Sequence, residues 1–240
     1  MTFLVATLIT EGKAKQLYTT ENEEVVRVHY LNQATALNGK RKESVAEKGL
    51  VNNEIDSLIF NYLNESGIKT HFIEKISASD QLVYKMQMVP LEVVIRNFAS
   101  GSFQKKFQVA YLKPFDRPVH EYYLKSDALD DPFINESQIQ ALALATPADL
   151  AVISRLAEQV NTALRQLFAK IDIDLVDFKL EFGKTPDGEI RVADEISPDS
   201  CRLVDQETHQ SLDKDVFRHR SGDVMSGYRT VLDRLLAVLN

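Results

Sequence analysis

The spacing of hydrophobic residues predicts a strand-rich first part of the chain with one helix. Residues 3–9 and 25–30 are rich in β-branched and aromatic side chains, which is typical of strands. Residues 73–89 predict two more strands around a polar Ser-Ala-Ser-Asp turn. Residues 50–66 instead repeat their apolar side chains every three or four positions, and Gly67 follows them. This pattern indicates a helix that stops at the glycine.

Two long helices are predicted in the second part of the chain. Thr146 and Pro147, followed by Asp149, have the composition of a helix start. Apolar residues recur at helical spacing after them and again over residues 224–239. Prolines interrupt residues 98–145, so we expect only loops and short elements there.

The two parts meet near Pro90, which precedes another strand-like run at residues 91–95. We therefore divide the chain into an N-terminal β-rich lobe, residues 1–89, and a larger α/β lobe, residues 90–240. The predicted fold class is α+β (α/β) with two lobes.

The most informative segment alternates polar and apolar residues on both sides of Asp187-Gly188, a dipeptide typical of a two-residue hairpin turn. Such a turn would place Glu181 directly opposite Asp194, with Lys179 on the same face. Pro186 cannot donate the hydrogen bond next to such a turn, although a four-residue loop would keep the same pairs opposed. Phe178, Leu180 and Phe182 would point to the other face, into the core.

Two opposed carboxylates repel each other unless a cation or a proton lies between them. With Asp177 and Lys179 close by, the pattern predicts a hard cation on Glu181 and Asp194, because Mg²⁺ typically binds one or two carboxylates together with substrate phosphates. A polar strand face balanced by Lys179 and Arg191 explains the same pattern without a metal.

Three other segments are candidates for binding charged groups, two of them for anions and the third for a substrate that carries both an ammonium and a carboxylate group. Lys13 and Lys15 lie on one face of an extended segment that follows the first predicted strand, and Arg96 ends an apolar strand before a small-residue loop. The turn after the hairpin brings Asp199 and Arg202 close in sequence. Surface lysines, an ordinary loop and an ion pair that braces a turn are the structural alternatives. The sequence has neither the phosphate-binding loop motif nor the dinucleotide fingerprint.

Composition limits the partners of this 240-residue chain. Its 28 basic and 35 acidic residues give a net charge of −7, which is unlike a protein that wraps nucleic acid. No apolar run approaches the roughly 18 residues that a membrane helix needs, so we expect no membrane partner. The single cysteine, Cys201, rules out an internal disulfide and is typical of the reducing cytoplasm.

Several motifs occur in order at separations typical of one enzyme family. They are Glu11-Gly-Lys-Ala-Lys15, Ala34-Thr-Ala-Leu-Asn-Gly39, Gly67-Ile-Lys-Thr-His-Phe72, Val89-Pro-Leu-Glu-Val-Val-Ile-Arg-Asn97, Ala99-Ser-Gly-Ser102, Val176-Asp-Phe-Lys-Leu-Glu-Phe-Gly183, Ala193-Asp-Glu-Ile-Ser-Pro-Asp-Ser-Cys-Arg-Leu203 and Leu212-Asp-Lys-Asp-Val-Phe217. Over nearly its whole length, the chain resembles the SAICAR synthetases (phosphoribosylaminoimidazole-succinocarboxamide synthases) of purine biosynthesis.

This resemblance implies a fold related to kinases and ATP-grasp ligases, with ATP in a cleft between the two lobes. It also implies a reaction in which carboxyaminoimidazole ribonucleotide and L-aspartate are joined as ATP is cleaved to ADP and phosphate. Mg²⁺ is the expected metal, and a homodimer is the expected assembly. A kinase-like phosphotransferase and a non-catalytic ATP sensor are the alternatives, although the Asp-Phe-Gly motif of protein kinases is broken at Asp177-Phe178-Lys179.

The resemblance also implies roles for individual residues. Lys179, Glu181, Asp194 and Asp177 would be catalytic, with Glu181 and Asp194 holding the metal; Lys13, Lys15, Met86, Gln87, Met88 and Val89 would bind ATP; Arg96, Ser102, Asp199 and Arg202 would bind the other substrates. Four positions depart from the family pattern: Thr10, Gln33, Lys106 and Val204.

Overall fold

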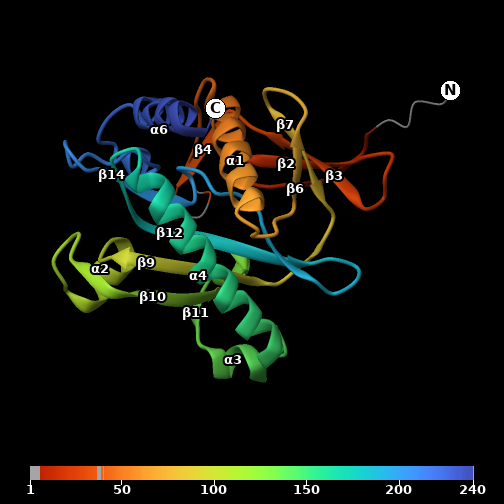
Figure 1. Ribbon diagram of the computed structural model, residues 1–240. Helices are drawn as coiled ribbons and strands as arrows, with labels where there is room; N and C mark the ends of the chain where they lie inside the picture. Colours follow the sequence, from red (N-terminus) through yellow and green to blue (C-terminus); the bar gives the residue numbers. More distant parts are fainter. Residues whose placement is uncertain (1–5, 37–38, 40, 240) are drawn as a thin grey trace.

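The structure, a computed structural model, describes residues 6–36, 39 and 41–239. Its N-terminal sheet has five antiparallel strands in the order β1-β2-β3-β7-β6 (Figure 1). These strands are β1 (Leu8–Glu11), β2 (Lys15–Thr19), β3 (Val25–Tyr30), β6 (Phe72–Lys75) and β7 (Asp80–Tyr84). The strand predicted at residues 3–9 overlaps β1 only at its end, and residues 1–5 lie outside the described part.

Helix α1 (Lys48–Glu65) follows a small two-stranded sheet and packs against the N-terminal sheet (Figure 1). The small sheet pairs β4 (Gln33–Ala36) with β5 (Arg41–Ser44). The helix ends as predicted, because the Gly67 N–H donates to the Asn64 carbonyl while the glycine adopts the left-handed conformation at φ +79°.

A second sheet of seven strands forms the larger lobe, in the order β11-β10-β9-β12-β13, with β8 and β14 also paired to β12. Its strands are β8 (Gln87–Met88), β9 (Leu91–Phe98), β10 (Pro114–Leu124), β11 (Phe133–Ile134), β12 (Ile173–Lys184), β13 (Ile190–Ala193) and β14 (Cys201–Asp205). The long strand β12 therefore pairs with β14 along its first half, with β9 in its middle, and with β13 and β8 toward its end.

The prediction of only short pieces between residues 98 and 145 was wrong. This region contains β10, which has 11 residues although it includes Pro114 and Pro118. The prolines are tolerated because the pairing of β10 with β9 is irregular between Pro114 and Val119, where the ladder does not require every N–H. The remaining elements here are α2 (Gly101–Phe107), a 3₁₀ turn (Asp127–Leu129) and α3 (Glu136–Ala141).

Helix α4 (Pro147–Ala169) covers one face of the second sheet (Figure 1). It begins at the predicted cap, where Thr146 and Asp149 form reciprocal side-chain to backbone hydrogen bonds. Its apolar stripe packs on the side chains that alternate inward along β12, and Phe178, Leu180 and Phe182 are buried there as predicted.

The last helices are α5 (Asp215–His219) and α6 (Val224–Leu239), and α6 packs against α1. One continuous cluster of buried apolar residues joins α1, α4, α6 and the second sheet. Phe72 of β6 belongs to this core, whereas Val26, Val28, Tyr30 and Val83 of the N-terminal sheet form a separate small cluster. The division at residue 89 lies between β8 and β9 and stays a prediction.

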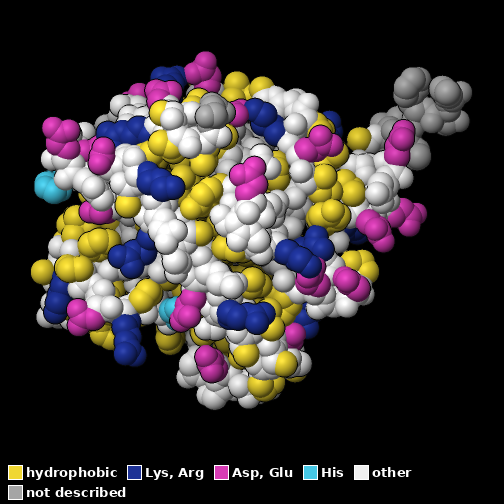
Figure 2. Space-filling view, viewed as in Figure 1, with side chains coloured by type: hydrophobic (Ala, Val, Ile, Leu, Met, Phe, Trp, Pro, Cys, Tyr) yellow, Lys and Arg dark blue, Asp and Glu magenta, His cyan; other side chains and the backbone are white. Residues whose placement is uncertain are grey.

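On the face shown in Figure 2, basic and acidic side chains are interspersed. None of the helices in the described ranges is long and apolar enough to cross a membrane.

Candidate active site

The face of the second sheet that does not pack on α4 is polar, because side chains alternate along each strand. Asp177, Lys179 and Glu181 follow one another on this face of β12. In the neighbouring strands, Arg96 of β9 and Arg202 of β14 both pair with Asp177. A bulge between Leu175 and Asp177 sets the second pairing. Strand register alone therefore places an arginine on each side of a carboxylate.

We call Arg96, Asp177 and Arg202 the arginine cluster. Arg96 NH1 donates to Asp177 Oδ2 at 2.7 Å, and Arg202 NH1 donates to Asp177 Oδ1 at 3.0 Å. Arg96 also donates to Glu121 Oε2 at 2.9 Å and to the Ser102 hydroxyl at 3.1 Å. The structure thus brings three of the predicted substrate-binding residues into direct contact with Asp177 or with one another.

The arginine cluster is buried on one side and accessible to solvent on the other. The side chains of Arg96 and Asp177 are almost wholly buried, whereas that of Arg202 is 22% exposed. Burial disfavours the charged guanidinium of Arg202, but Asp177 and Asp215 outweigh it and raise its pKa above the ordinary value. Arg202 is therefore a permanent cation on the accessible side of the cluster.

Gly101 allows Arg202 to lie against the chain at the start of α2. A Cβ at this position would lie 2.7 Å from Arg202 NH2, and the glycine has a φ of +53°. Any other residue would push the guanidinium away and strain the backbone. The small-residue loop predicted from the sequence therefore leaves the space that the Arg202 side chain occupies.

Lysines and carboxylates fill the other end of the polar face. We call Lys15, Lys125, Lys179, Glu181 and Asp194 the lysine–carboxylate cluster. Lys179 Nζ donates to Glu181 Oε1 at 2.7 Å and to Asp194 Oδ2 at 3.4 Å. Lys15 Nζ donates to Asp194 Oδ1 at 2.5 Å, and Lys125 pairs with Glu181 Oε2.

The predicted pairing of Glu181 with Asp194 was wrong by one residue. Glu181 lies opposite Ala193, because the Thr185 N–H donates to the Glu189 carbonyl and leaves a loop of three residues, 186–188, rather than two or four. Pro186 occupies the second position of a turn closed by the hydrogen bond from the Gly188 N–H to the Thr185 carbonyl, and Gly188 takes the left-handed conformation at φ +88°. This is the turn that proline and glycine favour at these positions.

Asp194 reaches the cluster by a different route from the one predicted. The strand ends at Ala193, and Asp194 adopts φ +66°. This conformation, which is unusual for a residue with a side chain, turns the carboxylate back toward Lys179. The two acids therefore share one ammonium although they do not face each other across the ladder.

The charged groups of this cluster shift one another's pKa values. Burial alone would raise the pKa of Asp194, but Lys15 and Lys179 outweigh it and hold that pKa well below the ordinary value. Burial also opposes the charged forms of the two lysines, yet Asp194 and its neighbouring acids raise the pKa of both ammonium groups. Glu195, 3.9 Å from Lys15, has a raised pKa because of its burial and its proximity to Asp194.

The donor set bears directly on the predicted metal. Every carboxylate oxygen of Glu181 and Asp194 is paired with a lysine, so ammonium groups suffice to balance the two acids. Among the described residues, no group of three or more His, Cys, Asp or Glu side chains is placed to hold a metal ion. Two carboxylates that converge on one cation nevertheless match the small protein share of a Mg²⁺ site that also uses phosphates. The Lys125 side chain, 46% exposed, is the ammonium that can leave Glu181 most easily. Arg191, which the metal-free explanation of the sequence pattern used together with Lys179, pairs with Glu189 and not with these two acids.

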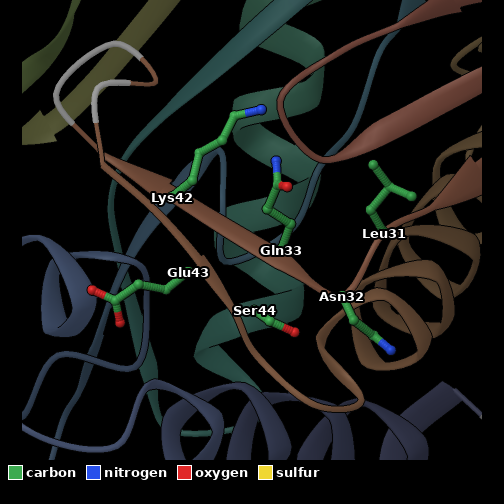
Figure 3. A pocket seen from close by; sticks show the side chains of 6 residues that line it. All are labelled: Leu31, Asn32, Gln33, Lys42, Glu43 and Ser44. Carbon is green, nitrogen blue, oxygen red and sulfur yellow. The ribbon is translucent and has the colours of Figure 1, made fainter.

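The residues predicted to bind ATP border this cluster. Lys13 lies in the turn between β1 and β2 and donates to Asp127 Oδ1 at 2.8 Å, while its carbonyl accepts a hydrogen bond from the Gln33 amide at 2.6 Å. Gln33 also lines a shallow groove, in which it and Lys42 point to the same side of the β4–β5 sheet (Figure 3). Gln33, one of the four positions where we expect a departure from the family pattern, thus supports the turn that carries Lys13.

The segment 86–89 runs beside the end of β12. Gln87 and Met88 pair with Lys184 and Gly183, and the Val89 N–H donates to the Phe182 carbonyl at 2.8 Å. A Cβ on Gly183 would lie 2.8 Å from the Met86 Cβ. The segment is therefore seated directly on β12, next to Glu181.

Asp199 lies apart from both clusters, in a buried network at the base of α6. It accepts hydrogen bonds from Lys48, from the Asn52 amide at 3.1 Å and from the Tyr228 hydroxyl at 2.6 Å, and Lys214 Nζ lies 3.7 Å away. These contacts hold the pKa of Asp199 well below the ordinary value despite its burial. Its predicted contact with a substrate stays a prediction.

Several charged residues of the site were not found from the sequence. Glu92 and Glu121, on β9 and β10, alternate on the same face as Arg96, so a correct strand assignment for residues 114–124 would have identified Glu121. Lys125 follows β10 without any motif. Glu195 adjoins Asp194 in the quoted motif, but its burial beside Lys15 depends on the left-handed turn.

The polar face has an arginine-rich end and a lysine-rich end, and its lysine-rich end lies against Lys15 of the N-terminal sheet. This arrangement suits a two-lobed enzyme with multiply charged substrates. The sequence profile described as SAICAR synthetase matches residues 8–235. The phosphoribosylaminoimidazole-succinocarboxamide synthase of Pediococcus pentosaceus is 55% identical over 229 residues, which are 95% of each chain.

Solved structures agree with this match. The crystal structure of the Ehrlichia chaffeensis enzyme of the same name superposes with a TM-score of 0.94 at 44% identity, covering 98% of this chain and all of that one. A SAICAR synthetase in complex with ADP gives a TM-score of 0.91 at 40% identity, covering 94% and 96%. The chain belongs to the SAICAR synthetase family, and it is an ATP-dependent ligase of purine biosynthesis.

Proposed function

We propose that this chain joins carboxyaminoimidazole ribonucleotide to L-aspartate, forming SAICAR, ADP and phosphate. The observation that carries the proposal is the pair of charged clusters on one sheet face, in a chain that matches the family over residues 8–235. The arginine cluster suits the anionic groups of a ribonucleotide. The lysine–carboxylate cluster suits the phosphates of ATP and an associated cation.

The chemistry requires an activated carboxylate, because oxide is too poor a leaving group for direct attack by an amine. We propose that a carboxylate oxygen of the ribonucleotide attacks the γ-phosphorus of ATP, so that the bond to ADP breaks and an acyl phosphate forms. The aspartate amine then attacks the acyl carbon and loses a proton, and the bond to phosphate breaks. The protein contributes mainly by positioning the reactants and stabilising charge.

Each cluster has a proposed share in this sequence. Lys13 and Lys15 would neutralise phosphate oxygens, and Lys179 would stabilise charge on the transferring group from its position between Glu181 and Asp194. Backbone groups of residues 86–89 would line the adenine. Glu181 and Asp194 would hold Mg²⁺ once phosphates attract the lysines away, and the metal would supply further charge neutralisation.

The other substrates would bind toward the arginine end. Arg202 offers the accessible guanidinium, while Arg96 and Ser102 support it from the buried side. Asp177 would orient both arginines rather than contact the substrate, because both arginines donate to its carboxylate oxygens. Asp199 would help to place a substrate near the turn before β14. We further propose that the enzyme works as a homodimer in the cytoplasm, where ATP is available.

The test is an omission assay on the purified protein. ADP formation is measured with Mg-ATP, the ribonucleotide and L-aspartate, and then with each component left out. We expect sustained ADP release only in the complete mixture. Sustained release without aspartate would favour a kinase-like phosphotransferase, which the family match does not support. Absence of turnover in the complete mixture would contradict the proposal.

A further inference from the structure

A buried carboxylate outside both clusters connects the two lobes. Asp56 lies in the middle of α1 and is wholly buried. Its Oδ2 accepts hydrogen bonds from the Tyr30 hydroxyl at 2.6 Å and the Gln81 amide at 3.0 Å, and its Oδ1 accepts one from the Ile196 N–H at 2.7 Å. These three partners are neutral groups.

The partners belong to different parts of the fold. Tyr30 is in β3 and Gln81 is in β7, so one carboxylate oxygen is fixed to the N-terminal sheet. Ile196 follows Asp194 and Glu195 in the segment that leaves β13, so the other oxygen is fixed to the backbone next to the lysine–carboxylate cluster. The Tyr30 ring also lies under Lys15, with Nζ 5.8 Å from its centroid.

The backbone at Asp194 needs such support. A left-handed conformation at a residue with a side chain costs on the order of 1–3 kcal/mol and persists only where the surroundings fix it. On one side of Asp194, the His71 N–H donates to the Val192 carbonyl at 2.8 Å. On the other side, the fixed point is the bond from Ile196 to Asp56.

We propose that Asp56 is a positioning residue for the ligase reaction. It holds the backbone of residues 194–196 so that the Asp194 carboxylate turns toward Lys15 and Lys179, and it has no contact with substrate. This inference rests on the role proposed above for Asp194.

The chemistry of the side chain explains why an acid is required. Three donors converge on it, and a carboxylate has no donor of its own when it is ionised. An amide would present an NH₂ group to one of the three donors. Burial raises the pKa of Asp56 to about 7, against the Tyr30 hydroxyl and the Lys15 ammonium, which favour the charged form. Assays at pH 8.5 therefore compare variants against the ionised parent.

The test uses the variants Asp56→Asn and Gln81→Leu of the full chain. Asp56→Asn changes the carboxylate itself, whereas Gln81→Leu removes a donor to Oδ2 and leaves Oδ1, which accepts from Ile196, unchanged. We expect Asp56→Asn to lower kcat at least tenfold while the KM for ATP rises no more than threefold. Gln81→Leu should lower the melting temperature and leave kcat within twofold. Parental kcat in Asp56→Asn, or an equal loss of kcat in both variants, would overturn the proposal.

A double-mutant cycle separates this inference from the proposed function. If Asp56 acts through Asp194, adding Asp56→Asn to Asp194→Asn should lower kcat by less than twofold further. Independent, multiplying losses would refute the positioning role while leaving Asp194 in the mechanism. Undiminished turnover in Asp194→Asn alone would instead contradict the proposed function. If Asp56→Asn does not fold, Asp56→Glu, which displaces the carboxylate by one methylene, should show the same selective loss of kcat; parental kcat there overturns the inference.

Discussion

Replacing Lys179 by methionine removes the cation that Glu181 and Asp194 share. The substitution keeps much of the side-chain volume but leaves buried carboxylates with fewer partners. Breaking a buried ion pair costs about 3–5 kcal/mol. Glu181 keeps Lys125 and Asp194 keeps Lys15, so we expect the lower end, about 3 kcal/mol. For a chain of this length that is a decrease in melting temperature of roughly 6–12 °C.

The effect of Lys179→Met on stability should depend on pH in a defined direction. In the parent, the depressed pKa of Asp194 stabilises the fold at pH values above the ordinary carboxyl pKa of about 4, and this stabilisation is lost as the pH falls through the lower folded value. Without Lys179 the pKa of Asp194 moves back toward the ordinary value. The stability deficit of the variant should therefore stay constant from neutral pH down to about pH 4 and decrease only as the pH falls further, through the pKa of Asp194 in the variant.

Activity gives the second measurement on this variant. Loss of a preorganised charge at a transferring phosphoryl group costs on the order of 100-fold in kcat, and we expect a decrease of that size in steady-state ADP release. Lys184→Met is the matched control, because Lys184 lies on the same strand but pairs with Asp149 at 2.8 Å, away from the cluster. It should change kcat less than twofold. A Lys179→Met enzyme with kcat within threefold of the parent would refute the reasoning.

Three further predictions follow from single contacts. Gly183→Ala places a methyl group against Met86, so it should cost about 1–3 kcal/mol and raise the KM for ATP several-fold in steady-state assays; an unchanged KM would remove the neighbouring segment from the nucleotide site. Arg202→Ala should raise the KM for the ribonucleotide at least tenfold, with a smaller effect on the KM for ATP, and equal effects on the two substrates would contradict the assignment. Burial raises the pKa of Asp213 to about 6, so its contribution to stability is present below pH 4 and is lost as the pH rises through 6. The free energy of unfolding, measured in urea, should therefore fall between pH 4.5 and pH 6.5 by up to about 2 kcal/mol more in the parent than in Asp213→Asn. An equal fall in the two proteins would refute this.

The start of α4, the end of α1 and the alternation along β12 could be predicted, because each depends on residues close together in the sequence. The cap of α4 has its proline and its two capping side chains at fixed offsets, and α1 ends at a glycine that the left-handed conformation requires. Alternation along β12 correctly assigned Phe178 and its neighbours to the core, because the period of a strand is two whatever its partners are.

What failed depended on geometry that extends beyond a local pattern. The hairpin dipeptide Asp187-Gly188 fits both a two-residue and a three-residue loop, and only the three-residue loop places Pro186 where proline is favoured. That difference of one residue moved Asp194 off the pairing that we predicted. The two acids still lie close together, because the left-handed conformation of Asp194 turns its carboxylate toward Lys179, which also pairs with Glu181.

Residues recruited from distant segments were the hardest to predict. Lys15 and Lys125 meet Asp194 and Glu181 only because the N-terminal sheet and the end of β10 close over β12. No spacing in the sequence connects them. The argument that two acids require a metal was incomplete for the same reason, since it could not count ammonium groups from other parts of the fold.

The most direct test of the account is a crystal structure of this protein with Mg²⁺ and a non-hydrolysable ATP analogue. We predict that the triphosphate lies against Lys13 and Lys15, with electron density for a metal that is coordinated by Glu181 and Asp194. A triphosphate bound elsewhere, or one bound here while both carboxylates keep all their lysine partners and no metal appears, would contradict it.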